Sequence, residues 1–170
     1  VTVYPDGNYH IDATSLHDLP VDHEATGSFN YAVQDDSSAV SGTASATIRI
    51  TGVNDPPTLS TASISANEDD LKTGIIGETG PEDLLANAQD VDDDDSILTV
   101  AQVNEAAGNV GQAVTVTLSY TTAQDTTQTQ DITLTVNANG TYSIGSVNLD
   151  PLPEGEEASG SFTYAVKDDS

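Results

Sequence analysis

The carboxylates of this chain are the residues whose number and spacing could do chemistry. Five of them occupy six consecutive positions at 90–95 (DVDDDD), between a predicted strand that ends near Gln89 and another that begins near Ile97. Calcium takes about six to eight oxygen ligands in a flexible geometry. Residues two apart point to the same side of an extended chain, so Asp90 and Asp92 could both reach one ion. The spacing predicts a calcium-binding loop.

Other acidic segments would join this loop if the chain folds into antiparallel sandwiches in series. The entry linker and two of the loops of a sandwich share one end, where they would meet a loop of the preceding module. Ionised carboxylates crowded into such a volume require a cation between them. Oxygen-only donors favour calcium over zinc, and flexible loops favour it over magnesium. The candidate calcium ligands at this junction are Asp22, Glu24, Asn54, Asp55, Asp90, Asp92 and Asp168.

Two further acidic groups are predicted to serve neighbouring junctions. Asp35 and Asp36 would lie at the junction before this one, and residues 68–70 would meet Glu154, Glu156 and Glu157 at the junction after it. The alternative for every one of these groups is a solvated loop, because charge runs are often only solvated.

The overall charge excludes some classes of function. Among 170 residues, 28 are acidic and 3 are basic, which gives a formal charge of −25. Such a chain repels DNA and RNA, so no nucleic-acid partner is expected. It has no apolar run long enough to cross a bilayer, so membrane insertion is not expected either. It also has no Cys, and a secreted module without disulfides commonly relies on bound metal instead.

An internal repeat sets the domain map. Residues 1–37 align without a gap with residues 134–170, an offset of 133, and 19 of the 37 pairs are identical. We therefore expect residues 1–53 to be the C-terminal part of one repeat and residues 54–170 to be the following repeat without its last strand. The boundary falls in the sequence GVNDPP at 52–57, because two prolines end a strand and stiffen a short linker.

Alternation of apolar and polar residues predicts the fold class. It has a period of two in five segments, which are 28–33, 44–50, 98–103, 114–120 and 132–136. Asn139-Gly140 and, in the first copy, Asp6-Gly7 indicate tight hairpins. A helical turn is expected only over Glu82–Ala88. We therefore predict an all-β protein of tandem antiparallel β-sandwiches of immunoglobulin-like or cadherin-like type, both repeats being truncated.

Several motifs together resemble a known family. They are ITGVNDPP at 50–57, NED at 67–69, DVD at 90–92, NGTY at 139–142, and Gly160-x-Phe162-x-Tyr164-x-Val166-x-Asp168. In combination they resemble the VCBS and cadherin-like tandem repeats of giant RTX-type bacterial adhesins. The resemblance covers nearly the whole chain. It implies export by type I secretion and an extracellular or cell-surface location.

The resemblance also implies a function. Such repeats are calcium-rigidified spacers that contact neighbouring repeats of the same polypeptide and serve adhesion and biofilm formation by projecting a binding domain from the cell. Cadherin linkers usually read Asp-x-Asn-Asp, and this chain has Gly52 at the first position. One ligand is therefore absent, and we expect one or two ions at the junction.

Catalysis is not expected. The histidines His10, His17 and His23 all lie in the first copy, and other residue types stand at their aligned positions. A catalytic base would not be expected to change between copies of one module. Sugar-cleaving sites rely on aromatic platforms, and this chain has no Trp. The alternative function is a calcium-dependent carbohydrate-binding or cell-binding module, for which the polar segment 121–130 is the distinguishing feature.

The phase of the repeat also predicts an interaction between fragments. The first copy contains the strand at 44–52, and the second copy ends before any counterpart of it. This strand could therefore complete the sheet of a neighbouring chain by strand exchange.

Overall fold

The computed structural model describes residues 1–66, 68–78, 83–92, 98–149 and 151–169. These residues divide into two compact units. Unit 1 contains residues 1–55 together with Val91 and Asp92, and unit 2 contains the described residues of 56–90 and 98–169. The division falls after Asp55, two residues beyond the boundary expected from the sequence.

Unit 1 is built from two hairpins. The strands β1 (Thr2–Val3) and β2 (Tyr9–His10) pair antiparallel, and so do β3 (Glu24–Tyr31) and β4 (Ala44–Thr51). A 3-10 helix, η1 (Thr14–Leu16), lies between the hairpins along the chain. The first turn forms because Gly7 adopts φ +86°, which suits glycine, and because the Asp6 carboxylate accepts a hydrogen bond from the Asn8 amide at 3.0 Å.

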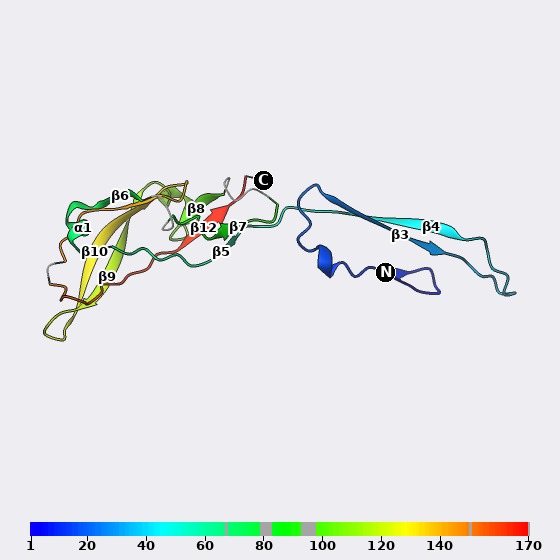
Figure 1. Ribbon diagram of the computed structural model, residues 1–170, viewed down its shortest axis with the longest axis horizontal. Helices are drawn as coiled ribbons and strands as arrows, with labels where there is room; N and C mark the ends of the chain where they lie inside the picture. Colours follow the sequence, from blue (N-terminus) through cyan, green and yellow to red (C-terminus); the bar gives the residue numbers. More distant parts are fainter. Residues whose placement is uncertain (67, 79–82, 93–97, 150, 170) are drawn as a thin grey trace. The chain divides into compact units, whose positions relative to one another are not determined.

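Unit 2 is larger and also almost entirely β (Figure 1). One antiparallel sheet has the strand order β6-β11-β10-β9, and the pairs β12-β8 and β5-β7 form two smaller sheets. The strands of the large sheet are β6 (Ile75–Glu78), β9 (Ala113–Thr121), β10 (Thr127–Val136) and β11 (Tyr142–Ile144). The remaining elements are β5 (Thr58–Leu59), α1 (Glu68–Thr73), β7 (Ala88–Gln89), β8 (Thr99–Val103), the 3-10 helix η3 (Ala107–Asn109) and β12 (Tyr164–Lys167).

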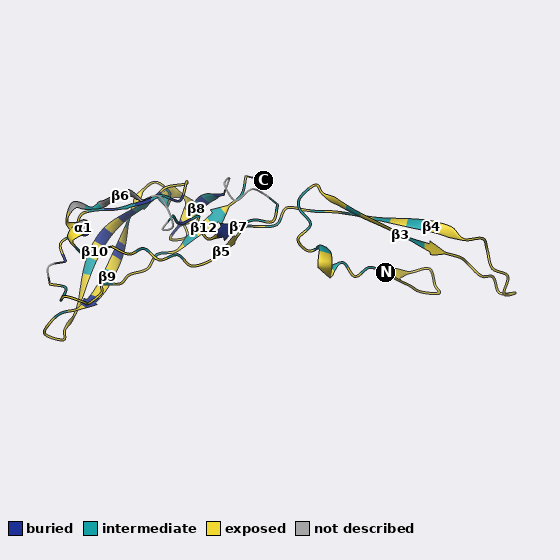
Figure 2. Cartoon of the chain, in the orientation of Figure 1, coloured by how far each residue is buried: buried dark blue, intermediate teal, exposed yellow. Residues whose placement is uncertain are grey.

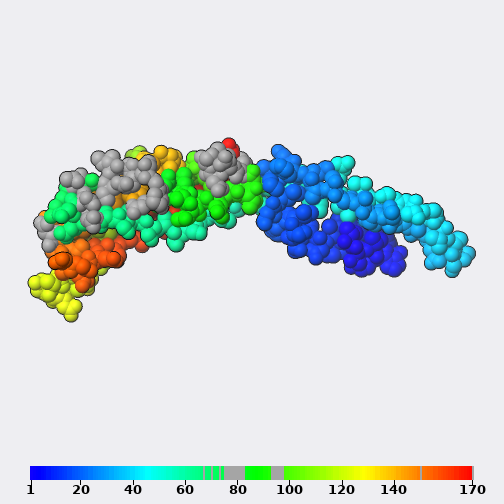
Figure 3. Space-filling model, viewed as in Figure 1, coloured from blue at the N-terminus to red at the C-terminus, as the bar shows by residue number. Residues whose placement is uncertain are grey.

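The predicted all-β class is confirmed, and each of the five segments with alternating residues overlaps an observed strand. The polar segment 121–130 contains the turn between β9 and β10, which projects beyond the rest of unit 2 (Figures 1 and 3).

Where a helical turn was predicted, over Glu82–Ala88, the described residues form two consecutive hydrogen-bonded turns and no helix. Glu82 lies outside the described residues, and the chain from Asp83 leads through turns into β7. The Asp83 carboxylate accepts a hydrogen bond from the Leu85 amide at 2.9 Å, a local interaction that competes with helix formation. The α-helix in the described residues is α1, a short polar segment without the apolar spacing that identifies helices in a sequence.

The core of unit 2 follows the pleat of its strands. On β10, Ile132, Leu134 and Val136 are buried with relative exposures of 9, 2 and 0 %, whereas Asp131 and Thr133 are exposed (Figure 2). These side chains pack with residues from the other strands, from α1 and from the connecting segments. The remaining buried members of the cluster are Leu71, Leu84, Val100, Val103, Val116, Tyr120, Tyr142, Ile144 and Leu149.

Unit 1 contains the same hairpin, but the side chains of its hairpin are exposed. The pair Val3↔Tyr9 in β1-β2 is the counterpart, 133 positions earlier, of Val136↔Tyr142 in β10-β11. Val136 and Tyr142 are both 0 % exposed, while Val3 is 48 % and Tyr9 is 64 % exposed. In unit 2 the strands β9 and β6 flank the β10-β11 pair, and β1-β2 is a two-stranded sheet. No described residue of unit 1 is fully buried.

The helices among the described residues are all too short to span a bilayer.

Tyr164 in unit 2 and its counterpart Tyr31 in unit 1 allow a test of the difference in burial between the two copies of the repeat. The Tyr164 hydroxyl donates a hydrogen bond to the Leu84 carbonyl oxygen at 3.1 Å, whereas Tyr31 is 44 % exposed. Replacing Tyr164 with Phe should lower the free energy of unfolding of unit 2 by about 1 kcal/mol, the usual net contribution of one hydrogen bond. Replacing Tyr31 with Phe should change the free energy of unfolding of unit 1 by less than about 0.5 kcal/mol. Urea unfolding of both variants measures this, and equal losses would contradict it.

Tyr164 should also ionise at a higher pH than an exposed tyrosine. Burial raises the pKa of its hydroxyl, and the negative charge of Asp83 raises it further. A raised pKa in the folded state gives a contribution to stability that is fully present below the usual tyrosine pKa of about 10 and is lost as the pH rises through the higher value. In an absorbance titration of tyrosinate, Tyr164→Phe should remove the component with the higher pKa, and Tyr31→Phe should leave it in place.

Candidate cation sites

Asp92 is the best-placed of the predicted ligands. Its Oδ1 accepts a hydrogen bond from the Val21 amide, and its Oδ2 accepts one from the Asp55 amide, each at 2.5 Å. The residue is half-buried and groups with unit 1. Hydrogen bonds to an ionised carboxylate are short and about twice as strong as neutral ones. Asp92 therefore connects two backbone segments that are distant in sequence, one before β3 and one after β4.

The backbone at Val21 and Asp55 is positioned by a close approach at Gly52. The Gly52 amide donates to the His23 carbonyl oxygen at 2.9 Å, and Gly52 forms a parallel bridge with Val21. A Cβ atom on Gly52 would lie 2.7 Å from the Pro20 carbonyl carbon and closer still to the carbonyl oxygens of Leu19 and Pro20. No side chain fits there, which gives a physical reason for the glycine.

Asp22 has an unusual backbone conformation. Its φ is +60°, in the left-handed region that favours glycine, and its side chain is exposed. The aligned residue of the second copy is Gly155, with φ +83°. The same turn is therefore made twice, once with glycine and once with a carboxylate. Aspartate tolerates this region better than most residues, but at some cost relative to glycine.

Three other predicted ligands lie in unit 1. Glu24 forms an ion pair with Arg49, with 2.6 Å between Oε1 and the guanidinium nitrogen. Asn54 is exposed and Asp55 is half-buried. The Glu24 carboxylate is thus already engaged by a cationic side chain.

The last two predicted ligands, Asp90 and Asp168, belong to unit 2 and are half-buried. The predicted loop continues through Asp93, Asp94 and Asp95, which lie outside the described residues. Within the described ranges, no three acidic or histidine side chains are close enough to hold a metal ion. The donors are chemically suited to calcium, since each carboxylate oxygen has a second lone pair, but the described residues do not gather all seven of them.

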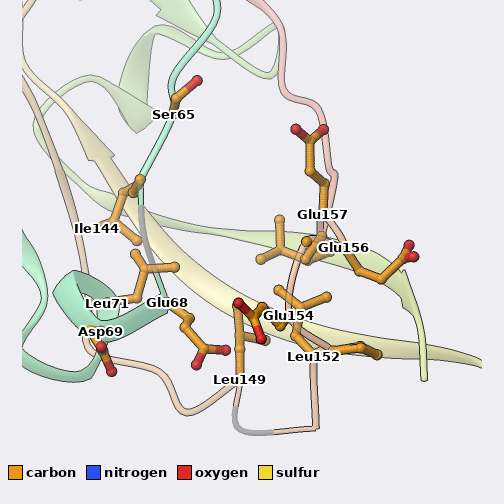
Figure 4. A pocket seen from close by; sticks show the side chains of 15 residues that line it. Ser65, Glu68, Asp69, Leu71, Ile144, Leu149, Leu152, Glu154, Glu156 and Glu157 are labelled. Atoms are coloured by element: carbon orange, nitrogen blue, oxygen red, sulfur yellow. The ribbon is translucent and has the colours of Figure 1, made fainter. Parts of the chain in front are cut away.

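A second acidic group surrounds a pocket in unit 2 (Figure 4). Its floor is apolar and its rim is acidic, and its volume is about 880 Å³. Glu68 Oε2 is buried and has no hydrogen-bond partner among the described residues. The acidic lining residues are Glu68, Asp69, Glu154, Glu156 and Glu157, and the apolar ones include Leu71, Leu118, Ile144, Leu149 and Leu152.

The sequence had grouped residues 68–70 with the glutamates at 154–157, and residues of both segments line this one pocket. The side chains of Asp69 and Glu156 point outward in Figure 4. The apolar floor was not expected. A signal for it was available, because Leu149 and Leu152 are the aligned counterparts of Leu16 and Leu19 in the repeat.

Comparison of the chain with protein-family models, with curated proteins and with solved structures gives no match.

Two glycines of unit 1 provide a matched test of the packing at Gly52. Gly52→Ala should destabilise unit 1 by about 1–3 kcal/mol, because the new methyl group collides with backbone that cannot move aside easily. Gly27, in β3, has nothing within 4 Å of an added Cβ, so Gly27→Ala should be neutral or slightly stabilising. The stability of unit 1 is measured by hydrogen exchange of the backbone amides next to Gly27 in β3 and next to Ile48 in β4. Equal protection in both variants would contradict the close approach.

Proposed function

We propose that the chain is a calcium-rigidified spacer module of a large bacterial surface adhesin, composed of cadherin-like β-sandwich repeats of the VCBS type. Such a protein would reach the extracellular surface by type I secretion and would serve adhesion and biofilm formation by projecting a binding domain. The observation that carries the proposal is the Asp92 carboxylate, which is held on both oxygens by backbone amides at Val21 and Asp55. The all-β fold and the repeat support it.

The position of Asp92 supports a role in stiffening the linker. Asp55 is followed by Pro56 and Pro57, which restrict the backbone where the chain passes to unit 2. An ion bound to the remaining lone pairs of Asp92 would stiffen the segment that its hydrogen bond to the Asp55 amide holds. Without the ion, the uncompensated negative charge of the chain would loosen the same segment.

The backbone at Asp22 supports a role for its side chain. Glycine satisfies the left-handed conformation at the aligned position 155, so the turn itself does not need a carboxylate. Residues held in unfavourable conformations are concentrated at functional sites. A ligand role for Asp22 would account for a carboxylate at a position that glycine fills at lower conformational cost.

The formal charge of −25 supports the choice of a cation as the stabilising agent. A chain with so few basic residues cannot neutralise its carboxylates internally, and the described residues contain two ion pairs. A ligand that binds the folded state alone stabilises that state by mass action. The acidic pocket around Glu68 is a second place where calcium would relieve repulsion, in line with a site at the next junction.

Calcium should raise the melting temperature, and a chelator should reverse the rise. Asp92→Asn should weaken calcium binding by about tenfold or more, because it removes the charge of one ligand. Asp125→Asn is the matched control, since Asp125 is exposed in the turn between β9 and β10. Titration calorimetry and thermal unfolding with and without calcium measure both effects. An unchanged melting temperature after chelation would refute the proposal.

The alternative function, a calcium-dependent carbohydrate-binding or cell-binding module, predicts a different result. A spacer should bind no glycan on an array in calcium or in chelator. Calcium-dependent binding of a glycan that is lost on deleting the turn at 122–126 would favour the alternative and identify that turn as the binding element.

A further inference from the structure

The turn between β10 and β11 contains the only Asn-Gly pair of the sequence, Asn139-Gly140. Asn139 is exposed. Asparagine is one of the chemically labile residues of proteins. Its side-chain amide can be attacked by the backbone nitrogen of the next residue, and glycine hinders this attack least because it has no Cβ. The pair can therefore undergo a reaction that neither the spacer function nor cation binding uses.

The reaction needs only water. The Gly140 amide loses its proton to water or hydroxide, and the nitrogen forms a bond to Asn139 Cγ while the electron pair of the carbonyl bond passes to Oδ1. Nδ2 then takes up a proton and leaves as ammonia, which gives a cyclic succinimide. Water opens this ring at either carbonyl carbon. The products are aspartate in the normal linkage and isoaspartate, in which the main chain runs through Cβ and Cγ.

Thr141 donates two hydrogen bonds to the oxygen on which negative charge develops during the attack. Its hydroxyl donates to Asn139 Oδ1 at 2.8 Å, and its backbone amide donates to the same oxygen at 3.3 Å. This side-chain turn folds the Asn139 carboxamide toward the backbone that follows it, which contains the attacking nitrogen. Donors that are already in place around such an oxygen stabilise the transition state.

Asn137 orients the Thr141 hydroxyl. Its Nδ2 donates to Thr141 Oγ1 at 3.0 Å, so the hydroxyl accepts one hydrogen bond and directs its own proton to Asn139 Oδ1. The Asn137 backbone amide also donates to the Thr141 carbonyl oxygen at 2.8 Å, which closes the turn. Hydrogen bonds in series polarise one another, and this arrangement makes the hydroxyl a stronger donor.

One hydrogen bond opposes the reaction. The Gly140 amide donates to the Asn137 carbonyl oxygen at 3.0 Å, and this bond must open before the nitrogen can lose its proton. Opening one ordinary hydrogen bond slows the reaction by about tenfold at most. A single preorganised oxyanion donor contributes about 100-fold or more in an enzyme, and Thr141 supplies two donors. The balance favours a faster reaction in the folded turn than in the unfolded chain.

The fold requires glycine next to Asn139. Gly140 has φ +82°, a conformation that disfavours any side chain. A Cβ atom there would also collide with the Asp83 carboxylate and would lie 2.7 Å from Leu85 Cγ. The reactive neighbour of Asn139 is therefore imposed by the turn and by the packing of unit 2.

The aligned turn of the first copy contains an aspartate at the position of Asn139. There the Asp6 carboxylate accepts a hydrogen bond from the Asn8 amide at 3.0 Å, and the Gly7 amide donates to the Tyr4 carbonyl oxygen at 3.0 Å. These bonds match those that Thr141 and Gly140 make in the second copy. The same turn thus forms with aspartate.

Isoaspartate has no such precedent in the chain. It would lengthen the main chain by one carbon atom between β10 and β11. The pair Val136↔Tyr142, which stands next to this turn, is 0 % exposed on both sides. A change in the length of the turn would therefore disturb the core of unit 2.

We propose that Asn139 is a site of spontaneous deamidation, at which Thr141 accelerates the attack of the Gly140 nitrogen. The aspartate product keeps the β10-β11 hairpin, and the isoaspartate product loosens it. The reaction adds one negative charge to the chain in either case.

The experiment incubates the full chain at mildly alkaline pH, in native buffer and in urea. Peptide mapping by mass spectrometry follows the exchange of the side-chain amide for a carboxylate, and enzymatic methylation of isoaspartate distinguishes the two products. Asn139 should deamidate about tenfold faster in the folded chain than in urea, with ammonia released in equal amount. The other asparagines should remain intact in the folded chain over the same time.

Two variants of Thr141 provide the matched control. Thr141→Val removes the hydroxyl and should slow deamidation of the folded chain by about tenfold, whereas Thr141→Ser keeps the hydroxyl and should react like the unmodified chain. In urea all three chains should react at the same rate. Hydrogen exchange of the Gly140 amide reports whether the turn is intact in each variant. Asn139→Asp should keep the protection of the Val136 and Tyr142 amides.

The comparison of native buffer with urea decides the proposal even if a variant opens the turn. Slower deamidation in native buffer than in urea would overturn it, because the turn would then protect Asn139. Equal rates for the Val and Ser variants in the folded chain would overturn the role of the Thr141 hydroxyl. Loss of protection in Asn139→Asp would refute the tolerance for aspartate. These rates compare the same chain folded and unfolded, so they do not depend on the proposed function.

Discussion

A β-strand can bury one face and satisfy both edges only when other strands are placed beside it, and this constraint accounts for most of the structure. Tyr142 is 0 % exposed because β6 and β9 flank the pair to which its strand belongs. Tyr9 has the same residue type, the same hairpin register and 64 % exposure. The local sequence makes the hairpin in both cases. Burial, and the stability that comes from burial, depends on segments that are distant along the chain.

Besides strand packing, hydrogen bonds from backbone amides to carboxylates are a second set of interactions that recurs in the structure. Hydrogen bonds from the Asn8 amide and side chain lower the pKa of Asp6, and those from the Thr14 hydroxyl and amide lower the pKa of Asp12. Asp92 accepts two amides from segments far from it in sequence. The lowered pKa of Asp6 and of Asp12 favours the ionised carboxylate without a basic side chain. Amides can orient a carboxylate, but they leave its net charge in place.

The sequence predicted the strands well because pleating is a local property. The alternation at 132–136 reflects which side chains of β10 face the core, and the structure has this alternation. The helix α1 was missed because its six residues contain a single apolar side chain, Leu71, and so give no periodic signal. The segment after Asp83 forms turns with a side-chain hydrogen bond to the Leu85 amide, and the residue pattern does not reveal this hydrogen bond.

The sequence indicated candidate donors, but it could not indicate the geometry in which the structure places them. Asp92 was identified from its spacing in an acidic loop, but its two amide partners depend on the fold. The steric reason for Gly52 was equally hidden, since it lies in the carbonyl groups of Leu19 and Pro20. The ion pair between Glu24 and Arg49 could be found only once the register of β3 and β4 was known.

Two aligned glycines of the repeat show how differently the strands are packed in the two units. A Cβ on Gly160 would lie 2.7 Å from the Thr117 carbonyl oxygen and 2.9 Å from Leu118 Cδ2, so glycine is required there by the strand that crosses it. Its counterpart Gly27 has nothing within 4 Å. Unit 1 therefore contains a glycine suited to a covered sheet, although its described residues supply no cover. Within the described residues of unit 1, the β3-β4 ladder and the two Asp92 hydrogen bonds join segments that are distant in sequence.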